Sequence, residues 1–152
     1  MIKEGDAAPD FTARDQTGAD IKLSDFHGQR VVLYFYPKDD TPGCTKQACS
    51  LRDSYDVFTE KGIKVFGVSN DDEASHRKFI SKFSLPFDLL ADTEKEIVGA
   101  YGVYGEKNMY GKKYMGINRT TFLIDEEGKI KKIFKKVNVE EHADEILKAF
   151  EN

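Results

Sequence analysis

Residues 31–36 read Val-Val-Leu-Tyr-Phe-Tyr, and residues 37–49 continue as Pro-Lys-Asp-Asp-Thr-Pro-Gly-Cys-Thr-Lys-Gln-Ala-Cys. The first run shows no alternation of apolar and polar residues, which is typical of a central parallel strand buried on both faces. Pro37 ends this strand, and an amphipathic helix begins near Cys44. Both cysteines of the chain fall in this segment. A cysteine at the start of a helix, just after a buried strand, indicates a site of thiol chemistry.

The chain that follows continues the alternation of helix and strand. Apolar residues spaced four, three, four and three apart predict one helix from Cys44 to about Lys61, capped by Gly62: Cys44, Ala48, Leu51, Tyr55 and Phe58. Residues 63–69 predict a second strand, and residues 73–83 a helix whose N-terminus is capped by one of the polar residues 70–72. Its inner face would carry His76, Phe79, Ile80 and Phe83. This order favours parallel strands joined by crossover helices.

The remaining segments complete a mixed sheet. Two short strands, 11–14 and 21–23, flank a turn and predict an N-terminal β-hairpin extension. A short extended piece (87–91) and a short helix carrying Ile97, Val98 and Tyr101 come before residues 102–116, which we expect to be a long loop with an irregular edge strand. Residues 119–125 and 130–134 predict an antiparallel hairpin, and residues 140–150 a final helix. We therefore expect a single α/β domain, residues 1–152, with a thioredoxin-like fold: a central mixed β-sheet flanked by helices.

Composition limits the classes of function. The 152 residues carry a net charge of −4, with 33% charged residues, which argues against a nucleic-acid or anionic-membrane partner. No apolar run approaches the ~20 residues of a membrane helix, and the first residues lack the apolar core of a signal peptide. We expect a cytoplasmic protein. In that reducing compartment, two cysteines five residues apart favour a catalytic, redox-sensing or metal-binding role over a structural disulfide.

The position of Cys44 favours an ionised thiol. Backbone N–H groups and the helix dipole at a helix N-terminus stabilise an anion, and Lys46 in the first turn adds positive charge, whereas Asp39 and Asp40 oppose it. The alternative is a small buried side chain at the head of an apolar stripe. Cys49 lies five residues on, which in an intact helix means a rise of roughly 7.5 Å and a rotation of roughly 140°. The two sulfurs cannot bond in that geometry, so pairing would require the first turns to unwind.

A metal site is not expected, because a zinc site needs about four ligands with recognisable spacing. The chain has only three histidines, His27, His76 and His142, and they are scattered. His76 lies on the apolar face of its predicted helix and is interpreted as a core histidine with its hydrogen bonds satisfied. No cofactor is predicted.

The motif from Pro37 to Cys44 resembles the Pro-x-x-x-Thr-x-x-Cys motif of the peroxiredoxins. The second cysteine, five residues later, is similar to the bacterioferritin comigratory protein subfamily, also called peroxiredoxin Q. The resemblance continues in residues 67–69, 115–117 and 119–125 and covers essentially the whole chain.

This resemblance implies a role for each matching residue. Cys44 would be the peroxidatic cysteine that becomes a sulfenic acid, and Cys49 the resolving cysteine that forms an intramolecular disulfide with it. Thr41 would orient the peroxide, Arg119 would stabilise the thiolate and the transition state, and Pro37 would shield the sulfur from water. A thioredoxin or similar dithiol protein would reduce the disulfide. The implied function is a thioredoxin-dependent peroxidase acting on hydrogen peroxide and organic hydroperoxides, and a monomer is expected.

Two other functions remain open on the residues alone. A thiol–disulfide exchange protein of the same fold would have its cysteines closer together, in a Cys-x-x-Cys pair. A redox sensor or holdase chaperone that signals by helix unwinding is compatible with the sequence as a secondary role.

Overall fold

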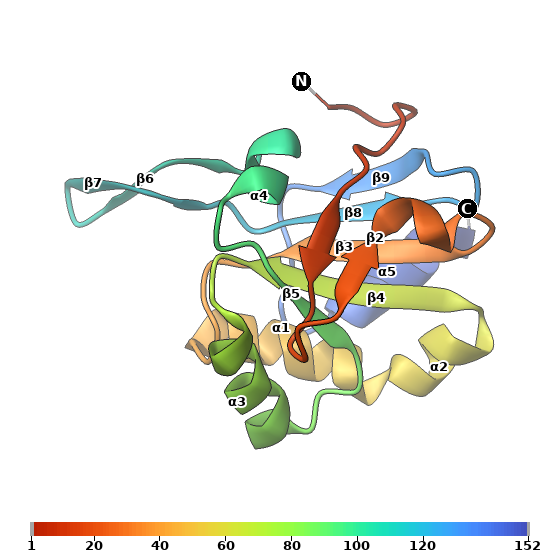
Figure 1. The fold of residues 1–152 in the computed structure, drawn as a ribbon, viewed down its shortest axis with the longest axis horizontal. Coiled ribbons are helices and arrows are strands. Elements are labelled where there is room, and N and C mark those ends of the chain that lie inside the picture. Colours follow the sequence, from red (N-terminus) through yellow and green to blue (C-terminus); the bar gives the residue numbers. More distant parts are fainter. Residues whose placement is uncertain (1, 152) are drawn as a thin grey trace.

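A computed structural model describes residues 2–151 and consists of nine strands and six helices in that range (Figure 1). The strands are β1 (Thr12–Arg14), β2 (Asp20–Lys22), β3 (Arg30–Phe35), β4 (Ile63–Ser69), β5 (Asp88–Ala91), β6 (Tyr104–Met109), β7 (Lys112–Ile117), β8 (Thr120–Ile124) and β9 (Ile130–Phe134). The helices are the short 3-10 helix η1 (Leu23–Phe26) and α1 (Pro42–Asp53), α2 (Tyr55–Glu60), α3 (Glu73–Phe83), α4 (Glu96–Ala100) and α5 (His142–Glu151).

Seven strands form one mixed sheet in the order β2-β1-β5-β4-β3-β8-β9. Strand β3 is an inner strand, parallel to β4 and antiparallel to β8, and the middle strand β4 is also parallel to β5. Residues 31–35 of β3 are all buried, as expected for a strand covered on both faces. The N-terminal hairpin β1–β2 extends the sheet through β5, and β8–β9 is antiparallel. The predicted thioredoxin-like α/β fold and its N-terminal hairpin are confirmed.

Two apolar layers hold the helices against the sheet. On one face, side chains of β3 and β4 pack against α1, α2, α3 and α5, and Cys44 lies in this layer. On the other face, the sheet packs against η1, α4 and the segments on either side of the β6–β7 hairpin. Figure 1 shows the four longer helices gathered on one side of the sheet. The site around Cys44 is therefore built on the helix-covered face, beyond the carboxyl end of β3.

The predicted helix from Cys44 to Lys61 is wrong as a single element. It is interrupted at Ser54, whose backbone (φ −112°, ψ 12°) ends α1 and begins α2. The apolar stripe nevertheless continues across the break, because Leu51 and Phe58 are both buried in the same layer. Gly62 follows α2 with φ of +70°, the left-handed conformation expected of a C-terminal cap.

The predicted loop at residues 102–116 is also wrong. These residues form the two-stranded hairpin β6–β7, which projects from the body of the molecule (Figure 1). Tyr110 and Gly111 make its turn, both with positive φ (53° and 80°). Most of the hairpin's side chains are exposed, so it has no buried face to impose an alternating pattern on the sequence.

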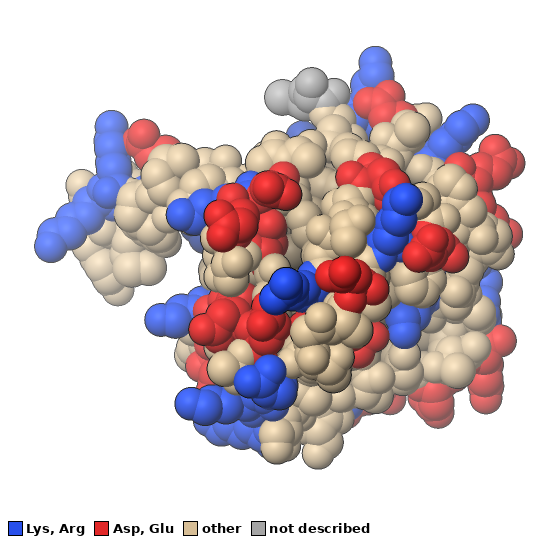
Figure 2. All heavy atoms as spheres, viewed as in Figure 1, with Lys and Arg blue, Asp and Glu red and all other residues tan. Residues whose placement is uncertain are grey.

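Charges are mixed over the surface. Figure 2 shows acidic and basic side chains interspersed on the face that it draws, with lysines on the projecting hairpin. No helix within residues 2–151 is long and apolar enough to span a membrane.

Candidate active site

The N-terminus of α1 places Cys44 at the edge of the buried layer. Thr41 is the N-cap residue with an extended backbone (φ −103°, ψ 156°), and Pro42 occupies the first helical position, where a missing N–H costs nothing. Cys44 follows two residues later, and only 1% of its surface is exposed. The Thr41 hydroxyl donates to the carbonyl of Lys38 at 2.9 Å. The cysteine therefore lies in the first turn of the helix, as the sequence predicted.

Arg119 lies beside the Cys44 sulfur although 75 residues separate them. Its Nη2 donates to the Sγ of Cys44 at 3.3 Å. Arg119 directly precedes β8, and β8 pairs with β3, the strand that leads to α1, so the sheet itself brings the two residues together. A guanidinium is permanently charged, and a positive group in hydrogen-bond contact with sulfur favours the thiolate.

Gly43 leaves room for this contact. A Cβ atom at this position would lie 3.1 Å from the Nη2 of Arg119, which is tighter than ordinary van der Waals contact. The glycine before Cys44 therefore allows the guanidinium to approach both the helix and the sulfur.

Gln47 is a site residue that the sequence analysis missed. Its side chain is fully buried, and its Oε1 accepts a hydrogen bond from the Nη1 of Arg119 at 2.6 Å. Its Nε2 has no hydrogen-bond partner in the described structure. Gln47 lies three residues after Cys44, so it faces the same side of α1. An uncharged polar residue on the buried side of a helix was the signal that could have identified it.

Neither Cys49 nor Pro37 forms a hydrogen bond to the sulfur of Cys44 within residues 2–151. Cys49 is half-buried within the intact α1, and both cysteines are free thiols. Pro37 is half-buried and is the second residue after the end of β3, directly following Tyr36. Among the hydrogen bonds of residues 2–151, the only side-chain partner of Cys44 is Arg119.

Nearby charges are arranged differently from the sequence-based expectation. Asp39 and Asp40, predicted to oppose the thiolate, are each paired with a cationic or imidazole group: Asp39 with His76 and Asp40 with Lys82, both at 2.7 Å. Lys46, predicted to add positive charge at the thiol, contacts Glu140 at 3.4 Å on the exposed surface. Arg119 is therefore the cation that contacts the sulfur.

The pKa values of two ionisable side chains near the site are shifted from their ordinary values. Burial, and then the charge of Cys44, raise the pKa of Tyr34 well above its ordinary value, so the tyrosine stays protonated. Its buried hydroxyl has no hydrogen-bond partner in residues 2–151. Burial, and then the charge of Arg119, lower the pKa of Lys107, which lies in the β6–β7 hairpin.

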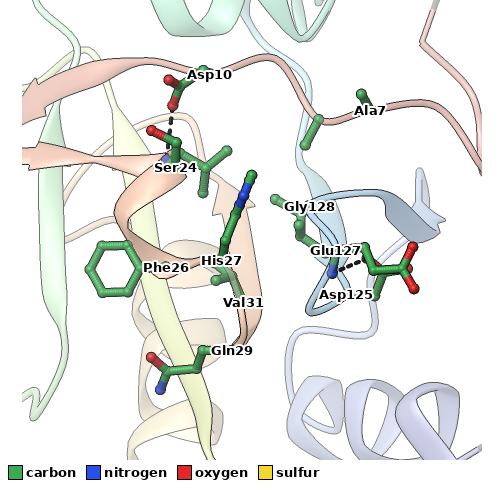
Figure 3. A pocket seen from close by; sticks show the side chains of 13 residues that line it. Ala7, Asp10, Ser24, Phe26, His27, Gln29, Val31, Asp125, Glu127 and Gly128 are labelled. Carbon is green, nitrogen blue, oxygen red and sulfur yellow. Dashed lines mark hydrogen bonds between the residues drawn. The ribbon is translucent and has the colours of Figure 1, made fainter.

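The histidines are not part of the thiol site. His27 lines a cavity of about 260 Å³ near the amino end of β3, with Asp10 and Gly128 among its neighbours (Figure 3). Cys44 lies beyond the opposite end of that strand. His76 is fully buried with both ring nitrogens in hydrogen bonds, which confirms the prediction of a satisfied core histidine.

A thioredoxin-like sheet carrying a buried cysteine at a helix N-terminus, in contact with an arginine, defines a protein of thiol redox chemistry. Comparisons with known proteins identify the class further. Residues 4–133 match the AhpC/TSA family, and the chain belongs to this family. It is 46% identical over 151 residues to peroxiredoxin Bcp of Bacillus subtilis, covering 99% of this chain and 96% of that protein.

Solved structures agree with this relationship. A mutant of Xylella fastidiosa PrxQ superposes with a TM-score of 0.93 at 32% identity, covering 99% of this chain and 96% of that one. The Xanthomonas campestris bacterioferritin comigratory protein, described for its alkyl peroxide reduction activity, superposes with a TM-score of 0.87 at 38% identity, covering 93% and 90%. The chain is thus an enzyme, a peroxidase of the peroxiredoxin class. These relationships favour a peroxidase over the alternative of a thiol–disulfide exchange protein.

Proposed function

We propose that Cys44 is the peroxidatic cysteine and that the enzyme reduces hydrogen peroxide and organic hydroperoxides. The observation that carries this proposal is the contact of 3.3 Å between the guanidinium of Arg119 and the buried sulfur of Cys44. The alkyl peroxide activity named for the Xanthomonas campestris relative supports the inclusion of organic substrates.

In the first step, the Cys44 thiolate attacks one peroxide oxygen. The S–O bond forms as the O–O bond breaks, the sulfur is oxidised to a sulfenic acid, and the leaving hydroxide or alkoxide takes up a proton to become water or an alcohol. Arg119, held by Gln47, has donors in place for the negative charge that moves onto the peroxide oxygens. Thr41 orients the peroxide: its hydroxyl donates to the carbonyl of Lys38, and its oxygen can at the same time accept a hydrogen bond from the O–H of the peroxide. Pro37 shields the sulfur from water.

In the second step, the Cys49 thiol attacks the sulfenic acid, and water leaves as the intramolecular disulfide forms. An intact α1 holds the two residues too far around the helix for an S–S bond. The active site therefore has two states: α1 is helical during attack on peroxide and locally unwound during disulfide formation.

We further propose that a thioredoxin or similar dithiol protein reduces the disulfide and regenerates both thiols. We also propose that the protein is a cytoplasmic antioxidant enzyme. The net charge of −4 and the interspersed charges in Figure 2 argue against a nucleic-acid or anionic-membrane partner. Both proposed redox cysteines lie in one helix of one chain, so the disulfide needs no second subunit, which supports a monomer. The single seven-stranded sheet, with strands between residues 12 and 134, supports one domain over residues 1–152.

The test is mass spectrometry of the reduced protein after one equivalent of peroxide. We expect a Cys44–Cys49 linkage within one chain, a trapped sulfenic acid in Cys49→Ser, and no peroxide consumption by Cys44→Ser. Thiols that remain unlinked in the unmodified protein, or turnover by Cys44→Ser, would refute the proposal.

A further inference from the structure

A buried polar cluster lies behind the loop that leads from β3 to Cys44. Its centre is the carboxylate of Asp39, two residues before the N-cap Thr41. Oδ2 of Asp39 lies 2.7 Å from Nδ1 of His76 and accepts a hydrogen bond from the Ser75 hydroxyl at 2.7 Å, while Oδ1 accepts from the Tyr36 hydroxyl at 2.5 Å. Asp39 is 7% exposed and His76 is fully buried, so water cannot replace these contacts.

The hydrogen bonds assign a role to each nitrogen of His76. Nε2 lies 2.9 Å from the carbonyl oxygen of Leu90, which can only accept, so Nε2 carries a proton. Nδ1 faces the Asp39 carboxylate, both of whose oxygens already accept from hydroxyl groups. Nδ1 and Oδ2 of Asp39, 2.7 Å apart, share the second hydrogen bond of the ring, so both ring nitrogens are satisfied within the protein. The pair thereby joins the active-site loop to α3 and, through Leu90, to β5.

The same loop is fixed by its backbone. The N–H of Asp39 donates to Oδ2 of Asp71 at 2.8 Å, and the Ser69 hydroxyl donates to the same oxygen at 2.7 Å. The next residue, Asp40, has φ of +56°, a conformation that costs energy for a residue other than glycine, and its carboxylate contacts Lys82 of α3. Contacts to β4, β5 and α3 thus hold a short loop whose far end is the first turn of α1.

A metal is a poorer explanation for this cluster. Ligand atoms of Asp39, Asp71 and His76 lie within 4.8 Å of one another, which is close enough for a shared ion. The carboxylate oxygens that face one another, however, already accept N–H and O–H donors from within the protein. The hydrogen bonds of Asp39, Asp71 and His76 therefore account for the cluster without a metal. We call these three residues the clamp.

We propose that His76 and Asp39 are positioning residues that hold the active-site loop, and through it α1, in the helical state that reacts with peroxide. This inference rests on the proposed function and adds to it the part of the molecule that sets the balance between the two states of α1. Loosening the clamp would move Cys44 away from Arg119 and favour the unwound state. It would therefore change the two chemical steps in opposite directions, which general destabilisation would not do.

The test measures the two steps separately in Asp39→Asn and His76→Gln. Sulfenic acid formation with hydrogen peroxide is followed in a Cys49→Ser background by quenched-flow mass spectrometry. Disulfide formation is followed in the protein with both cysteines. We expect sulfenic acid formation to slow by about tenfold and the subsequent disulfide formation to accelerate by about threefold. Asp71→Asn, which changes a half-buried tether of the same loop, should shift both steps in the same directions and provides a milder variant if the others do not fold.

Ile130→Val is the matched control, because it destabilises the opposite core layer without touching the clamp. It should lower the Tm and leave the ratio of the two rates unchanged. The inference is overturned if the clamp variants react like the unmodified protein, or if both steps slow in parallel with the loss of Tm. Failure of the unmodified protein to form the Cys44–Cys49 disulfide would instead refute the proposed function, and this inference with it.

Discussion

Replacing Gln47 with leucine should separate stability from activity. The hydrogen bond from the charged Arg119 to Gln47 contributes about 1.5–3 kcal/mol to folding, but the unpaired buried Nε2 of the same side chain costs about 1–3 kcal/mol. Leucine has a similar volume and removes both contributions. We therefore expect the free energy of unfolding of Gln47→Leu to stay within about 1 kcal/mol of that of the unmodified protein.

The rate of peroxide attack should nevertheless fall in this variant. Without Gln47, Nη1 of Arg119 loses its buried acceptor, and the half-exposed guanidinium can turn away from the Cys44 sulfur. A loss of about 1.4 kcal/mol of transition-state stabilisation corresponds to about a tenfold slower reaction. The assay is a single turnover with hydrogen peroxide in a Cys49→Ser background, combined with urea unfolding of the same samples.

Ser50→Ala is the control, because it alters a side chain of the same helix whose hydrogen bond goes to Ala143 and not to Arg119. We expect its rate to remain within about threefold of the unmodified rate. The proposed role of Gln47 is wrong if Gln47→Leu reacts at the normal rate. It is also wrong if the leucine variant loses several kcal/mol of stability in proportion to its activity.

Three further predictions concern other parts of the molecule. Cys49→Ser should leave the Cys44 sulfenic acid unresolved, so excess peroxide should convert it to sulfinic acid, detected by intact-mass spectrometry; equal resistance to over-oxidation in both proteins would exclude Cys49 as the resolving thiol. Burial lowers the pKa of His142 from its ordinary value of 6.5, so below that pH the unfolded chain binds a proton that the folded chain does not, and stability should fall as the pH falls. His142→Gln should flatten this dependence in urea titrations between about pH 5 and 7, whereas an unchanged slope would assign it to other groups. Tyr110→Asn should raise the free energy of unfolding by about 0.5–1 kcal/mol, because Tyr110 is 99% exposed and adopts φ of 53° at the hairpin turn, a conformation that asparagine tolerates better; no gain in chemical denaturation would contradict this reasoning.

The fold could be predicted largely because buried elements leave strong patterns. The uninterrupted apolar run of β3 and the helical spacing in α3 each reflect burial in a core made mostly of apolar side chains. The break at Ser54 could not be predicted from the sequence pattern. The apolar residues of α1 and α2 continue one helical spacing into the same core layer, and neither glycine nor proline separates the two helices. The hairpin β6–β7 was missed for a related reason. Most of its side chains are exposed, so its sequence does not need the alternation of apolar and polar residues that identifies a strand.

The site was predictable where its chemistry depends on rare residue types. The cysteine motif and Arg119 could be identified from the resemblance to peroxiredoxins, and the sheet register brings them together. Gln47 and the cluster around Asp39 depend on tertiary contacts between α1, α3 and β8, and one sequence contains no record of which polar groups will face one another. The charge of Asp39 looked adverse to a thiolate because its partner, His76, lies 37 residues further along the chain.

The β6–β7 ribbon has a consequence for the behaviour of the protein at high concentration. Its two strands pair only with each other in the part of the chain that the structure describes, so both outer edges present free backbone donors and acceptors. Such edges are templates for strand addition by a neighbouring molecule, and exposed methionine and tyrosine side chains on the ribbon would strengthen that contact. Lys107, Lys112 and Lys113 lie on the same two strands, and their mutual repulsion between molecules opposes fibril-like stacking. Added salt screens this repulsion, so the ribbon is where self-association of the enzyme should begin.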